Sequence, residues 1–242
     1  MEQELRRLET VGKFRKFDFD LNGSLWGILK LASDICETPV AFITLIDEHD
    51  QWFKAKLGFD VACMPRNTSF CTHAIKQQDA MVVPDALADE RFMDNPLVTG
   101  VPNIRFYAGA PLKAADGNNI GTLCVMDVHA KEITQGKLEH LEILAKQAMH
   151  LMELELTYKL LNEKILQVEQ QNETLKNIAF IQSHEFRAPV ASIMGLMNII
   201  KEEEYDSPKE YLLLMEEAVR MLDQKIHIVV RSTEVTERNY MA

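Results

Sequence analysis

The sequence predicts an α+β domain, an antiparallel sheet flanked by helices, followed by a long coiled-coil helix and a helical hairpin that forms a dimeric four-helix bundle. Two observations lead to this fold class. Eight of the ten glycines precede residue 130, where they lie among short β-branched runs typical of strands. Beyond residue 136 the sequence has one further glycine, Gly195, and apolar residues recur at spacings of three and four, as they do in helices.

The first half of the chain contains a helix and then several strands. Residues 25–36, LWGILKLASDIC, have the spacing of an amphipathic helix. Turn-forming residues at 48–50 and 116–118 separate neighbouring strand-like runs, so we expect hairpins and antiparallel pairing. The predicted strands are VAFITLID (40–47), QWFKAKLG (51–58), AMVVPDA (80–86), IRFYAGAPL (104–112) and NNIGTLCVMD (118–127).

A long heptad pattern follows. From Leu151 to Ile200 the apolar positions step by three and four residues without a slip, which predicts a coiled-coil seam. Asn172 occupies an a-type position, where a buried amide favours a two-stranded register. The alternative is a single amphipathic helix packed on its own domain. At ~1.5 Å per residue the helix is roughly 100 Å long, and no segment of this chain could cover it, so we expect a homodimer.

The last segment predicts a second helix that turns back on the first. The long helix should end near Tyr205, and Ser207, Pro208 and Glu210 then form a capping box with proline in the first turn. Two such hairpins, one from each copy, would bury both seams as a four-helix bundle.

Composition excludes some classes of function. The net charge of −11 leaves little cationic density for a nucleic-acid partner. No apolar run approaches 18 residues, and the N-terminus lacks a signal-peptide core, so no membrane span is predicted. The four cysteines fit neither a disulfide framework nor a paired zinc motif, and we expect a reducing cytoplasm and no metal.

The stretch S-H-E-F-R-A-P (183–189) concentrates reactive residue types within the long helix. His184 falls at an f position and should face water, and its i+3 and i+4 neighbours cannot ligate a metal. Glu185 could accept a hydrogen bond from the ring Nδ1, which would leave Nε2 as a nucleophile. Pro189 should bend the helix beside the ring. Such an imidazole could take up a phosphoryl group, and an ordinary surface histidine is the alternative.

Residues 175–240 resemble the dimerisation and histidine-phosphotransfer domain of sensor histidine kinases, whose signature is H-E-[LF]-R-x-P. The resemblance implies that His184 is the phosphoacceptor and Glu185 its acid–base partner, with Arg187 and Pro189 in supporting roles. It also implies two partners: an ATP-binding domain that supplies the phosphoryl group, and a response-regulator receiver domain whose aspartate accepts it.

Two departures from that family matter. Ala188 stands where many members carry Thr or Asn, which makes phosphatase activity by that route doubtful. The ATP-binding domain, with its asparagine box and glycine-rich lid, is not found after the second helix, so ATP and Mg²⁺ are expected only with a domain missing from this chain. We therefore expect the sensory and phosphoacceptor portion of a histidine kinase. The alternative is a non-catalytic dimeric adaptor, or a phosphorelay protein phosphorylated by a separate kinase.

The first half is similar to a GAF domain in the stretches 64–75 (MPRNTSFCTHAI), 82–112 and 117–127 (GNNIGTLCVMD). We expect a GAF sensor over residues 1–155, a coiled-coil signalling helix over 150–178 and the phosphotransfer hairpin over 175–240. The resemblance implies a small-molecule pocket, but the fold alone does not name the ligand. The candidate pocket residues are Cys71, His73 and Phe106, with Trp52 as a further pocket or core residue.

Alternative uses of these residues are open. Cys71 beside His73 could hold a covalent bilin, or form a metal or redox site together with Cys63. The motif of cyclic-nucleotide-binding GAF domains is not found. A loop with Asp85, Asp89 and Arg91 is expected to form structural ion pairs.

Overall fold

The structure is a computed structural model that describes residues 2–17, 19, 23–205 and 208–240, and the side chains of these residues except 181–182 and 228–240. The chain divides into two compact units, Met1–Leu161 and Asn162–Ala242. The first unit contains the sheet, and the second contains the end of the long helix and the helix that follows it.

A six-stranded antiparallel sheet forms the centre of the first unit, in the order β3-β2-β1-β6-β5-β4. Each of the five predicted strands is confirmed. The short strand β3, which pairs with β2, was not predicted. The strands are β1 (Val40–Ile46), β2 (Asp50–Leu57), β3 (Cys63–Pro65), β4 (Met81–Val83), β5 (Phe106–Lys113) and β6 (Asn119–Asp127).

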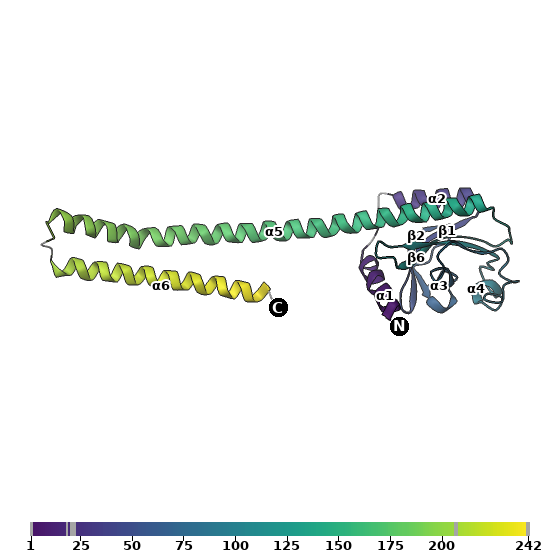
Figure 1. Ribbon diagram of the computed structural model, residues 1–242, viewed down its shortest axis with the longest axis horizontal. Helices are drawn as coiled ribbons and strands as arrows, with labels where there is room; N and C mark the ends of the chain where they lie inside the picture. Colours follow the sequence, from purple (N-terminus) through teal and green to yellow (C-terminus); the bar gives the residue numbers. More distant parts are fainter. Residues whose placement is uncertain (1, 18, 20–22, 206–207, 241–242) are drawn as a thin grey trace. The chain divides into compact units, whose positions relative to one another are not determined.

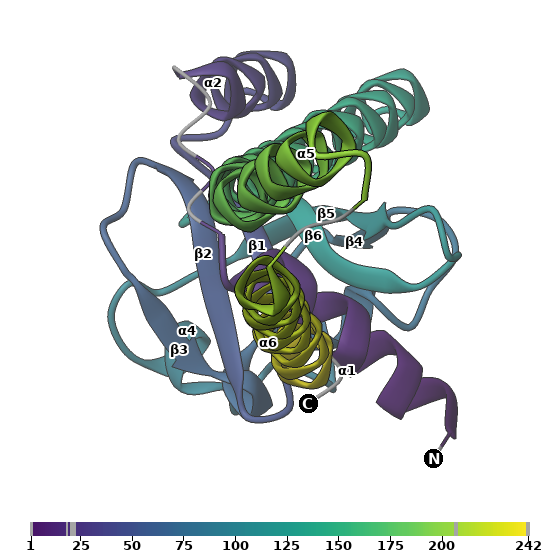
Figure 2. The same cartoon turned by 90° about the vertical axis from the view of Figure 1, so that its left-hand side faces the viewer.

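Helices cover both faces of this sheet (Figures 1 and 2). On one face lie the predicted helix α2 (Ser24–Cys36) and the first part of α5 (Gln135–Glu202), and on the other lie two short helices, α3 (Cys71–Ala74) and α4 (Pro96–Thr99). The sheet therefore has two buried apolar clusters, one on each face. Because side chains alternate along a strand, neighbouring residues of β5 and β6 belong to different clusters.

An N-terminal helix, α1 (Glu2–Arg15), was not predicted. The buried guanidinium of Arg7 donates to the backbone oxygen of Ile46 at 2.6 Å, and Val11 and Phe14 join the cluster beneath α2. These contacts fasten α1 to the end of β1.

Close packing between β1 and β6 depends on Gly121. A Cβ atom at this position would lie 1.7 Å from the backbone oxygen of Thr44, which is much closer than van der Waals contact. The two central strands therefore require glycine here.

The first part of α5 binds the sheet through one side only. Met149, Met152 and Leu156 are buried in the cluster, whereas Leu154 and Tyr158 on the opposite side are 67% and 59% exposed. For this stretch the structure agrees with the alternative, an amphipathic helix packed on its own domain. Further along, the predicted seam residues Ile165, Val168, Asn172 and Leu175 are exposed as well.

In the second unit, α6 (Lys209–Tyr240) lies beside the end of α5, so the predicted second helix is confirmed (Figure 1). Ile200 of α5 and Ala218 of α6 are buried. The predicted cap Ser207 lies outside the described residues, and the dimeric bundle stays a prediction. Among the described helices, none combines the length and apolar character that crossing a membrane requires.

Candidate functional site

His184 lies on α5 with its side chain exposed, as its heptad position predicts. The ring of Phe180, one turn earlier and also exposed, lies 6.4 Å from the imidazole, centroid to centroid. The imidazole is therefore open to solvent on a helix surface, with an aromatic ring on one side.

Glu185 makes a different contact from the expected one. Its carboxylate accepts a hydrogen bond from the ammonium group of Lys225 on α6, and this bond holds the pKa of Glu185 below its ordinary value. Among the described side chains, no hydrogen bond joins Glu185 to the ring of His184, because adjacent residues on a helix do not face each other. The proposed acid–base role of Glu185 stays a prediction.

The rest of the motif continues the helix. Arg187 is exposed, the side chain of Pro189 is buried, and α5 runs through Pro189 without interruption. Proline has no N–H, so the backbone oxygen of Glu185 lacks its usual donor in the next turn. Below it, the hydroxyl of Ser192 donates to the backbone oxygen of Ala188 at 3.1 Å.

The GAF-pocket candidates do not converge on one site. Cys71 is fully buried on the α3 side of the sheet, and His73 is half-buried against the edge of Phe92, with ring centroids 5.0 Å apart. Burial lowers the pKa of His73, as do the neighbouring cations. Phe106 is buried on the opposite face, beneath α2 and α5, because β5 turns alternate side chains to opposite faces. Its neighbour Tyr107 is the residue that meets Cys71.

An apolar pocket of about 160 Å³ opens on the α3–α4 side of the sheet. Phe42 of β1, Phe53 of β2 and Met126 of β6 form its floor, and the segments around Phe59 and Ile104 form its walls. Its lining suits an apolar small molecule. The sequence did not indicate this pocket, because its residues come from four separate segments and each segment has the apolar composition of an ordinary core.

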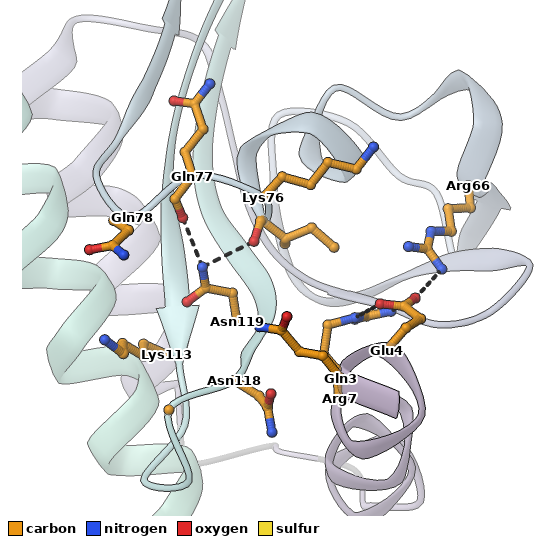
Figure 3. Close-up of a pocket in the computed structure, with 12 residues that line it drawn as sticks. Gln3, Glu4, Arg7, Arg66, Lys76, Gln77, Gln78, Lys113, Asn118 and Asn119 are labelled. Atoms are coloured by element: carbon orange, nitrogen blue, oxygen red, sulfur yellow. Dashed lines mark hydrogen bonds and ion pairs between the residues drawn. The ribbon is translucent and has the colours of Figure 1, made fainter. Parts of the chain in front are cut away.

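A larger, polar cavity of about 480 Å³ lies between α1, the β5–β6 turn and the segment after α3 (Figure 3). Glu4 accepts from both Arg7 and Arg66, and the side chain of Asn119 donates to two backbone oxygens of the α3–β4 loop. Lys76 points away from Asn119 in this view. The Glu4–Arg66 contact joins α1 to the segment that follows β3, and the Asn119 contacts join β6 to the α3–β4 loop.

The remaining candidate residues, Cys63 and the loop residues Asp85, Asp89 and Arg91, do not form one common site. Cys63 is exposed on β3, and in the described part of the chain no cluster of three or more His, Cys, Asp or Glu side chains could hold a metal. Asp89 and Arg91 form the expected ion pair at 2.6 Å, whereas Asp85 accepts from the backbone nitrogen of Leu87.

Comparison with solved structures finds similar folds. The GAF domain of a phosphoenolpyruvate-protein phosphotransferase from Acinetobacter is 17% identical, with a TM-score of 0.45, and the match covers 63% of this chain and 94% of that one. A free methionine-R-sulfoxide reductase from Neisseria meningitidis is 19% identical, with a TM-score of 0.43, over 53% of this chain and 77% of that one.

A cyclic di-GMP phosphodiesterase of Pseudomonas aeruginosa is 44% identical over 127 residues. The match covers 51% of this chain and 22% of the phosphodiesterase, so the chain spans about a fifth of that relative's length.

The sequence model of the GAF domain family matches residues 20–151, which is more than half of the chain. These residues hold all six strands of the sheet and the helices α2, α3 and α4. The chain therefore belongs to the GAF domain family.

Proposed function

We propose that the chain is the sensory and phosphoacceptor portion of a two-component sensor histidine kinase. In this proposal the GAF domain senses a signal and His184 accepts the phosphoryl group. The supporting observation is the exposed imidazole of His184, within the motif H-E-F-R-A-P, on a helix that packs against α6 in a hairpin.

Phosphoryl transfer to His184 requires the protein mainly to position the reacting groups, with little covalent chemistry of its own. A ring nitrogen of His184 attacks the γ-phosphorus of ATP held by a separate ATP-binding domain, the P–O bond to ADP breaks, and the ring keeps the group as a P–N phosphoramidate. A carboxylate of a response-regulator receiver domain then attacks phosphorus, and the P–N bond breaks. To act as the acid–base partner of the ring, Glu185 must exchange its hydrogen bond with Lys225 for one with the imidazole, because the Lys225 bond lowers the pKa of Glu185 and makes it a weaker base.

A second copy of the chain is the partner that suits the exposed seam. Leu161, Ile165 and Val168 are about half exposed and follow the heptad spacing, and Asn172 provides the polar a-type position that selects two strands. The homodimer would cover this apolar surface, which water otherwise contacts along several turns of α5.

The apolar pocket above Phe42 and Phe53 is the proposed sensory site, since GAF domains can bind small molecules. Its side chains favour an uncharged ligand with an apolar surface.

Phosphoryl transfer from labelled ATP tests this proposal. The chain is incubated with a separately expressed histidine-kinase ATP-binding domain, and acid-labile, alkali-stable label on the chain is measured. We expect His184→Gln to abolish the label. His227→Gln is the matched control, because His227 is an exposed histidine of the same unit on α6, and it should label as the parent chain does. Label that persists in His184→Gln would refute the assignment.

The identity to the phosphodiesterase favours a second candidate, a sensory segment that serves cyclic di-GMP signalling as a non-catalytic dimeric adaptor. The same experiment separates the two, because an adaptor remains a dimer but takes up no label on His184.

A further inference from the structure

A pair of buried thiols lies between α3 and the centre of the sheet. Cys71 is the first residue of α3, and Cys124 lies in the middle of β6. Both side chains are 0% exposed, and their sulfur atoms are 3.7 Å apart. The two residues are 53 positions apart in the sequence, so only the fold brings them together.

The surroundings of the pair are polar although the layer is apolar. The hydroxyl of Tyr107 donates to the sulfur of Cys71 at 3.5 Å. Gly109, which pairs with Cys124 across the β5–β6 ladder, leaves room for that hydroxyl, since a Cβ there would lie 2.1 Å from the Tyr107 oxygen. The hydroxyls of Thr44 and Thr122 bond to each other at 3.1 Å on the same face.

These contacts make the two thiols unequal. Burial raises the pKa of Cys71, but hydrogen bonds from Cys124, Thr122, Tyr107 and Thr44 outweigh it and lower the pKa. Burial raises the pKa of Cys124 well above its ordinary value. Cys71 is therefore the thiol that ionises first, with Cys124 beside it as the second thiol.

We propose that Cys71 and Cys124 form a redox-modification site, which hydrogen peroxide converts reversibly into a disulfide within the GAF domain. The proposal is independent of the proposed phosphoacceptor role, since it involves no residue of the second unit.

The reaction balances with peroxide as the oxidant. The Cys71 thiolate attacks one peroxide oxygen, the O–O bond breaks, and the released hydroxide takes a proton to become water. The Cys124 sulfur then attacks the resulting sulfenic acid, an S–S bond forms, and a second water leaves. The two thiols lose two electrons and two protons, and one peroxide becomes two waters.

The two sulfur atoms must move closer together before a disulfide can form. A disulfide needs its sulfur atoms at about 2.05 Å, so the 3.7 Å separation of the pair must close by roughly half, which requires rotation of the two side chains or movement of the single-turn helix α3. The oxidant must be small and uncharged, because both sulfurs are covered. Of the other two cysteines, Cys36 is buried on the opposite face and Cys63 is exposed on β3.

The test uses the full chain with Cys63→Ser, which removes the exposed thiol and its intermolecular reactions. The reduced protein is treated with hydrogen peroxide, remaining thiols are alkylated under denaturing conditions, and peptides are mapped without reduction. We expect an intact-mass loss of two hydrogens, a Cys71–Cys124 cross-linked peptide, alkylated Cys36, and recovery of the reduced mass with dithiothreitol.

Cys124→Ala in the same background should lose the two-hydrogen mass decrease and the cross-link, because the Cys71 sulfenic acid then has no thiol beside it. If the Cys124→Ala variant does not fold, peptide mapping of the Cys63→Ser protein alone tests whether the Cys71–Cys124 disulfide forms. A chain that keeps both Cys71 and Cys124 alkylatable after peroxide overturns the proposal, and so does a cross-link between any other pair of cysteines.

Discussion

At the scale of single residues, Lys225 has the most direct bearing on the His184 motif, because its ammonium group binds the carboxylate next to the histidine. The heptad position predicted that His184 faces solvent, since that follows from spacing alone. The ion pair between Glu185 and Lys225 was not predicted, because its partners are 40 positions apart and meet only when α6 folds back.

Lys225→Met should raise the pKa of Glu185 toward its ordinary value, because the hydrogen bond and the charge that favour the ionised form are removed. A carboxyl with a lowered pKa in the folded state stabilises that state above its unfolded pKa, and the contribution disappears as the pH falls. The measurement is an NMR titration of the Glu185 side-chain carbon. Lys201→Met, an exposed lysine at the end of α5, is the control. An unchanged Glu185 titration in Lys225→Met would contradict the assigned contact.

Glu4→Gln should weaken the first unit in a pH-dependent way. Its hydrogen bond with Arg7 lowers the pKa of Glu4 to about 2, with Arg66 adding to the effect against the cost of burial. The side chain of Glu4 is 42% exposed, so solvent screens the pair, and we expect the unfolding free energy at pH 7 to fall by only about 1 kcal/mol.

The sign of this pH dependence follows from the lowered pKa. The stabilisation is present above the unfolded pKa of about 4.3 and is lost as the pH falls toward about 2 in the folded state. Urea denaturation of both proteins at pH 7, 5, 4 and 3 checks this, and the difference between them should shrink below pH 4. A constant difference over this range would exclude the ionised Glu4 as its cause.

The face of the sheet on which a residue lies was harder to predict. Phe106 and Tyr107 are both aromatic and both fully buried, so composition does not say which of them turns toward α3. A one-residue change in register exchanges the faces. The Cys124–Gly109 pairing, which the structure supplies, settles the orientation.

At the scale of elements, the packing of β1 against β6 leads to a test of one glycine. Gly121→Ala would place a Cβ against the backbone of Thr44, and overpacking of this kind costs about 1–3 kcal/mol. Gly27→Ala in α2 is the matched control, because nothing lies within 4 Å of its added Cβ, and a helical alanine gains about 0.5–1 kcal/mol. Urea midpoints should therefore move in opposite directions. Equal midpoints for the two variants would contradict the close approach of the strands.

Local sequence patterns predicted the elements with strong patterns of their own. The strands β1, β2, β5 and β6 lie in short apolar or β-branched runs separated by turns, and α2 has a clear apolar side. The elements that were not predicted, β3, α3 and α4, are three or four residues long, and the surrounding fold determines their conformation. The helix α1 was missed as well, although its four apolar residues, Leu5, Leu8, Val11 and Phe14, recur every three residues, a spacing typical of helices.

At the scale of the whole molecule, the proposed homodimer can be broken at one seam position. Ile165→Glu places a charge where the heptad faces its copy, so the dimer dissociation constant should rise by at least about tenfold, which is 1.4 kcal/mol. Leu166→Glu is the control, because Leu166 is 57% exposed and one position off the seam. Sedimentation velocity over a concentration series measures both. A parent chain that stays monomeric at every concentration would refute the coiled coil.

The two tryptophans give the molecule a built-in optical label. Trp26 lies exposed on α2, and Trp52 lies half-buried in β2 beneath the guanidinium of Arg15; both belong to the first unit. Indole fluorescence therefore reports on the sheet domain alone, whereas circular dichroism at 222 nm is dominated by the long helices. Denaturation curves recorded with the two signals would coincide if the units melt together and would separate if each melts by itself.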